Sequence, residues 1–167
     1  MIARRFVMST VVLAIVAAGC GGGGLSLQEY LTTMDGLQSS FQQKSEDSQT
    51  EVQAALQEVT SNEDALTVFR GYLEESLAAI DEQLAKLEGL DPPSEAESEH
   101  EDLLEAGNAI RDSLADVIDR YGEFGSVEEV AQFFTTNLGD AEQQGTDACN
   151  ALQAVADDNE IDVDLGC

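Results

Sequence analysis

The chain has 167 residues, of which 34 are acidic and only 7 are basic, so its formal net charge is −27 at pH 7. Such a surface repels the phosphates of nucleic acids and anionic lipid headgroups, which excludes a nucleic-acid-binding role. Hydrophobic residues make up 43% of the chain, and a chain with this apolar content is expected to fold as one domain despite its charge.

The first 19 residues have the layout of a secretory signal peptide. A short basic start with two arginines precedes an almost unbroken apolar run over residues 6–18, and small residues lead to Cys20. The apolar run is too short for an ordinary membrane-spanning helix. We therefore expect an exported, extracytoplasmic protein.

Residues 17–20, Ala-Ala-Gly-Cys, resemble the bacterial lipobox, in which a peptidase cleaves before a cysteine that carries diacylglycerol. The common pattern has Leu where Ala17 stands. The resemblance implies that residues 1–19 are removed and that lipid on Cys20 anchors the protein to the cell membrane. Ordinary signal cleavage with an unmodified Cys20 is the alternative. The glycines within residues 20–25 predict a flexible tether, followed by a folded domain over residues 26–167.

Loss of the signal peptide removes two of the seven basic residues, which leaves five against 34 acidic ones, a balance of −29. This charge favours cations, basic peptides or amine-bearing small molecules as ligands. Adaptation to a salty habitat explains the acidity equally well, because crowded carboxylates scarcely repel one another near 1 M salt, where the Debye length is about 3 Å.

Apolar residues at helical spacing predict four amphipathic helices. The first begins at a Ser26–Glu29 capping box and is either interrupted or weakly packed where Ser45 and Ser48 occupy its apolar stripe. The second begins at Ser61 and ends near Gly89, before a Pro92-Pro93 break.

A capping box over residues 94–97 predicts the start of the third helix, and Ser126 caps the fourth, which Gly139 and Gly145 can divide. The short connections favour antiparallel neighbours, so the fold expected is an all-α, up-down bundle of about four helices. A helical hairpin array that dimerises to complete its core is the alternative.

Two cysteines remain beside Cys20. In an exported protein such a pair most often forms a disulfide, so we expect a Cys149–Cys167 bridge that pins the C-terminal tail to the last helix. A metal site would need further thiols or histidines, and the chain has one histidine. The acidic tail lacks the order of a calcium-binding EF-hand loop and is expected to be solvated.

His100 is the single histidine and lies on the inward phase of the third helix. Together with Glu97 and Glu101 it forms a candidate ligand or pH-responsive site, because imidazole titrates in the physiological range. A hydrogen-bonded histidine at the end of a core is the alternative. Glu97-x-x-His100 is one copy of a spacing that di-iron bundles use twice, and a second copy is missing.

No catalytic set is visible in the sequence, and no cofactor is expected. Aromatic side chains at helical spacing predict plain core, with the lining of a small pocket as the alternative; they are Phe69, Tyr72, Tyr121, Phe124, Phe133 and Phe134. The sequence therefore predicts a non-enzymatic binding module for a cation or small ligand. The competing hypothesis is a structural scaffold that contacts an envelope protein.

The segment 90–93, Leu-Asp-Pro-Pro, followed by His100 and by two leucines at 103–104, is similar to a pattern in predicted helical lipoproteins of actinobacteria and related groups. The segments 148–153 and 162–167 are similar to the tails of the same proteins. The resemblance covers roughly the second half of the mature chain. It implies a helical exported domain with a terminal disulfide, and it brings no function with it.

Overall fold

The structure, a computed structural model, describes residues 24–167 and contains no strand within that range. The prediction of an all-α fold is confirmed. The predicted signal peptide (residues 1–19), Cys20 and most of the predicted tether lie outside the described residues. The described part contains five α-helices and one short 3-10 helix: α1 (Leu27–Glu58), α2 (Asn62–Glu88), α3 (Glu97–Asp119), η1 (Tyr121–Glu123), α4 (Val127–Leu138) and α5 (Ala141–Asp158). None of these helices is long and apolar enough to cross a membrane.

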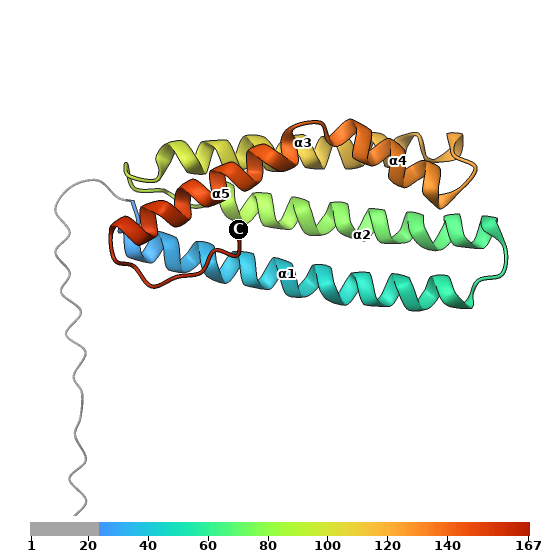
Figure 1. The fold of residues 1–167 in the computed structure, drawn as a ribbon, viewed down its shortest axis with the longest axis horizontal. Helices are drawn as coiled ribbons and strands as arrows, with labels where there is room; N and C mark the ends of the chain where they lie inside the picture. The colour runs from blue at the N-terminus through green and yellow to red at the C-terminus, as the bar shows by residue number, and fades with distance from the viewer. Residues whose placement is uncertain (1–23) are drawn as a thin grey trace, which may run out of the picture.

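The helices lie along one long axis (Figure 1). The chain runs out along α1, returns along α2 and runs out again along α3, and α4 and α5 then lie one after the other along α3. Helix α3 packs against α2, α4 and α5, whereas α1 contacts mainly α2 and touches α5 only slightly. At the entry to the bundle, the Leu25 backbone N–H donates to the Asp91 carbonyl oxygen at 3.2 Å. Leu25 therefore lies beside the α2–α3 loop.

Five helices replace the predicted four because the last segment divides at Gly139. This residue has φ +53°, a conformation that glycine adopts without the steric cost that a side chain would bring. Gly145, the other proposed division point, lies inside α5 without breaking it.

Serine caps begin three of the helices as predicted. Ser26 and Glu29 form the reciprocal capping box of α1, and Ser61 and Ser126 accept hydrogen bonds at the starts of α2 and α4. The capping box predicted over residues 94–97 is wrong. A turn closed by the Ala96 N–H and the Pro93 carbonyl oxygen precedes α3, so Ala96 becomes the N-cap without a side-chain hydrogen bond.

The core has two clusters. The first joins the start of α1, the end of α2, the α2–α3 loop, α5 and the tail; its buried members are Tyr30, Leu31, Met34, Leu87, Ala96, Leu152, Ala156 and Leu165. The second joins α2, α3 and α4, and its buried members are Leu73, Leu114, Val117, Tyr121 and Val130. Helix α1 contributes buried residues only from its first turns. Helix α1 runs unbroken past Ser45 and Ser48, so it is weakly packed there rather than interrupted.

The predicted disulfide is present, with Cys149 and Cys167 sulfurs 2.01 Å apart. Leu165 of the tail is buried in the first core cluster. The Gln153 side chain clamps the tail backbone, because its Nε2 donates to the Val163 carbonyl oxygen at 3.1 Å and its Oε1 accepts from the Leu165 N–H at 2.9 Å. The tail is therefore packed onto the bundle near the start of α1.

Candidate ligand-binding site

His100 lies in the first core region, near the start of α3, with 5% of its surface exposed. Its Nδ1 is 3.0 Å from the hydroxyl oxygen of Tyr30, which is fully buried in α1. The two rings meet edge to face, with centroids 5.8 Å apart. A buried hydroxyl needs such a partner, because an unpaired one costs about 1–3 kcal/mol.

Burial favours the neutral form of both members of this pair. It lowers the pKa of His100, against a smaller opposing effect of the Glu101 charge. It also raises the pKa of Tyr30, with the nearby Glu99 charge acting in the same direction. The geometry is that of a satisfied core histidine, the alternative that the sequence left open.

Glu97 and Glu101, the other residues of the sequence-based candidate site, are exposed on α3. Within residues 24–167 no hydrogen bond joins either carboxylate to His100, and Glu101 acts on the imidazole only through its charge. No group of three or more His, Cys, Asp or Glu side chains in this range is arranged to hold a metal ion.

A cavity of about 340 Å³ lies between α1 and α2, further along the bundle. Four helices contribute its lining: Phe41, Lys44, Ser45 and Ser48 from α1, Tyr72, Leu73, Glu75, Ser76, Ala79 and Ile80 from α2, Leu114 from α3, and Phe134 from α4. The walls are mainly apolar and aromatic, and the serines add a few hydrogen-bonding groups.

The sequence of α1 explains this space. Ser45 and Ser48 stand in the stripe of α1 where large apolar side chains would otherwise fill the gap toward α2. Opposite them lie Tyr72, Leu73 and Ile80, so the small serines leave apolar walls uncovered. Protein interiors normally close such gaps, because lost packing contacts cost free energy.

Two charged side chains belong to the lining, and their environments differ. Lys44 donates to Glu82 on α2 at 2.8 Å, and Lys86 donates to the same carboxylate at 2.6 Å. Hydrogen bonds from these two lysines, with their charges, lower the pKa of Glu82 to about 2. Glu75 is exposed and has no ion-pair partner among the described residues. The lining charge that remains uncompensated is therefore negative.

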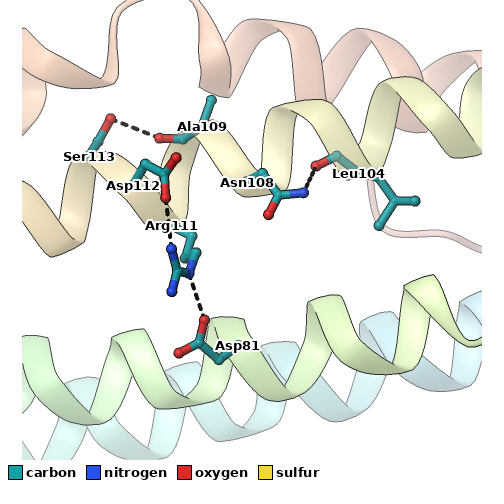
Figure 2. Close-up of polar contacts among 7 residues, drawn as sticks. All are labelled: Asp81, Leu104, Asn108, Ala109, Arg111, Asp112 and Ser113. Atoms are coloured by element: carbon teal, nitrogen blue, oxygen red, sulfur yellow. Dashed lines mark hydrogen bonds and ion pairs between the residues drawn. The ribbon is translucent and has the colours of Figure 1, made fainter.

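The other basic side chains are also paired with carboxylates. Arg111 on α3 donates to Asp81 on α2 and to Asp112, each at 2.8 Å (Figure 2). Each of the five basic side chains within residues 24–167 contacts at least one carboxylate; they are Lys44, Arg70, Lys86, Arg111 and Arg120. The many remaining carboxylates leave a strongly negative surface.

A second hollow, of about 350 Å³, lies between α3 and α5. Its charged lining residues are all acidic: Glu99, Asp102, Glu105 and Asp147. It lacks the apolar walls of the first cavity, and its carboxylates do not converge on one point as calcium ligands do.

The α1–α2 cavity was not predicted from the sequence, in which Ser45 and Ser48 appear only as polar breaks in the apolar stripe of α1. Of the six aromatic residues for which a pocket was the alternative, Tyr72 and Phe134 line the cavity. Tyr121 and Phe124 line a third hollow, of about 470 Å³, beside the start of α2. Phe69 and Phe133 pack against the second core cluster, of which Tyr121 is a buried member. Comparison of the chain with protein-family models, curated proteins and solved structures finds no match.

Proposed function

We propose that this protein is a lipid-anchored, extracytoplasmic binding module that holds a small ligand in the α1–α2 cavity. In this proposal lipid on Cys20 attaches the chain to the cell membrane, and an up-down, antiparallel helical bundle carries the site. Membership of the actinobacterial-type lipoprotein group, with its Pro-Pro and His100 pattern, is part of the same proposal. No catalytic step is assigned.

The cavity itself is the observation that supports this function. Its volume of about 340 Å³ lies in the range of about 300–1,000 Å³ typical of small-molecule sites. Mainly apolar walls with a few polar groups are also typical of such sites. The cavity begins at Phe41, roughly 21 Å along α1 from Leu27 at 1.5 Å per residue, which separates it from the tether and the membrane.

Equilibrium binding of a neutral, solvent-sensitive dye such as Nile red tests the proposal. The mature protein is expected to enhance the dye fluorescence with a one-to-one stoichiometry. Ser48→Leu provides the matched variant, because it fills the cavity from α1 and Ser48 makes no hydrogen bond within the described residues. Loss of dye binding in this variant supports the proposal. Equal binding by both proteins would overturn it.

A structural scaffold for an envelope protein is the second candidate. Its support is the surface on which every described basic side chain is already paired and most carboxylates are not. In that case the acidity reflects salt adaptation, and the melting temperature should rise smoothly with any salt. A selective rise with one cation, at fixed ionic strength, would count against it.

A further inference from the structure

The charges on the α1–α2 cavity restrict what it can hold. Lys44 is the one basic side chain in the lining, and its pairing with Glu82 leaves little positive charge for an anionic ligand. Glu75 lines the same cavity without an ion-pair partner among residues 24–167. A ligand carboxylate would meet an uncompensated negative charge there, whereas a ligand ammonium group would find a counter-ion.

The walls of the cavity favour a ligand that is mainly apolar. Phe41, Tyr72 and Phe134 bring aromatic rings to the lining, and Leu73, Ile80 and Leu114 bring aliphatic side chains. Burial of apolar surface provides the main attraction, and aromatic faces also attract cations. The overall charge of the mature chain acts in the same direction, because it concentrates cations near the surface.

We propose that the ligands of this cavity are hydrophobic amines, with the apolar part between α1 and α2 and the protonated amine beside Glu75. This inference rests on the proposed function and adds the ligand class. Ser45 and Ser48 offer further hydrogen-bonding groups, since neither makes a hydrogen bond within the described residues.

Calorimetric titration at fixed ionic strength tests the ligand class with three probes of one shape: 4-phenylbutylamine, 4-phenylbutanol and 4-phenylbutanoate. The protein is the full chain with Cys20→Ser, which retains every described residue and keeps lipid out of the assay. Glu75→Gln removes the counter-ion. Glu88→Gln is the matched control, an exposed glutamate roughly 20 Å further along the same helix and outside the cavity lining.

The amine is expected to bind about 5-fold more tightly than the alcohol, the upper end of what an exposed ion pair contributes, and the carboxylate is expected to bind least. Glu75→Gln should remove most of the amine preference and leave alcohol binding unchanged, while Glu88→Gln should preserve the preference.

The outcomes distinguish the amine assignment from the assignment of the cavity as the binding site. Equal binding of amine and alcohol, or equal loss of the preference in both glutamine variants, overturns the amine assignment and leaves the small-ligand proposal standing. Alcohol binding that persists unchanged in Ser48→Leu, or no binding of any probe, overturns the cavity as the site and the amine assignment with it.

Discussion

Removal of the Cys149–Cys167 bridge gives a prediction whose magnitude follows from the chain itself. The two cysteines are 18 residues apart, and closing a loop of this length in the unfolded chain contributes about 3 kcal/mol in the chain-entropy model. We expect the Cys149→Ser, Cys167→Ser double variant to keep the Gln153 hydrogen bonds and the Leu165 packing. Its free energy of unfolding should therefore fall by about 3 kcal/mol through the unfolded state alone.

Urea denaturation of the oxidised wild type and the double variant measures this difference. The variant should also show a larger m-value, because its unfolded chain is less compact. Leu165→Ala with the bridge intact is the matched variant for the tail, and truncation of a buried Leu should cost about 2–5 kcal/mol. If the tail packs onto the bundle without the bridge, adding Leu165→Ala to the double variant lowers its stability by a similar amount. A loss below about 1 kcal/mol on removing the bridge would refute the loop-entropy reasoning.

Three further predictions concern the anchor, the buried pair and the cavity. Cys20→Ser should abolish incorporation of labelled palmitate and release the protein from the membrane fraction; unchanged labelling would contradict lipidation at this residue. Burial lowers the pKa of His100 from its usual 6.5. Near that pH the unfolded chain therefore binds more protons than the folded chain. The stability that His100 contributes is present above about pH 6.5 and is lost as the pH falls below it. His100→Asn should flatten that part of a urea-measured stability profile, and Tyr30→Phe, which leaves Nδ1 unpaired, should cost about 1–3 kcal/mol; identical profiles for wild type and His100→Asn would exclude the linkage. Ser48→Leu should raise the melting temperature by about 3 °C, the shift expected from about 1 kcal/mol of added burial, and an unchanged or lower melting temperature would show that Leu does not fill the cavity.

Local signals predicted the helices well where they acted within one turn. The Ser26–Glu29 capping box and the Ser61 and Ser126 caps depend on groups three residues apart, so the sequence contains the whole interaction. The residues 94–97 satisfied the same pattern without forming the cap. There Pro93 accepts a hydrogen bond from Ala96, and burial of Ala96 moves the start of α3 to Glu97.

The features that involve distant segments were less predictable. Helical phase placed His100 inward, but its partner Tyr30 is 70 residues away on another helix. Periodicity indicates which side of a helix is buried and contains no information on which residue faces it.

The cavity shows the same limit, because Ser45 and Ser48 leave a space only where α2 presents large apolar walls to them. The spacing of two polar residues in a stripe predicts weak packing, whereas the volume and lining of the resulting cavity depend on four helices at once.

Chemical-shift mapping of backbone amides during titration with 4-phenylbutylamine tests directly whether the α1–α2 cavity binds a ligand. We expect saturable shift changes concentrated at residues 41–48 of α1 and 72–80 of α2, with Phe134 of α4 also affected. Ser48→Leu should remove these changes. Changes spread over the acidic surface, changes centred on His100 and Tyr30, or no saturable change would contradict a ligand-binding cavity between α1 and α2.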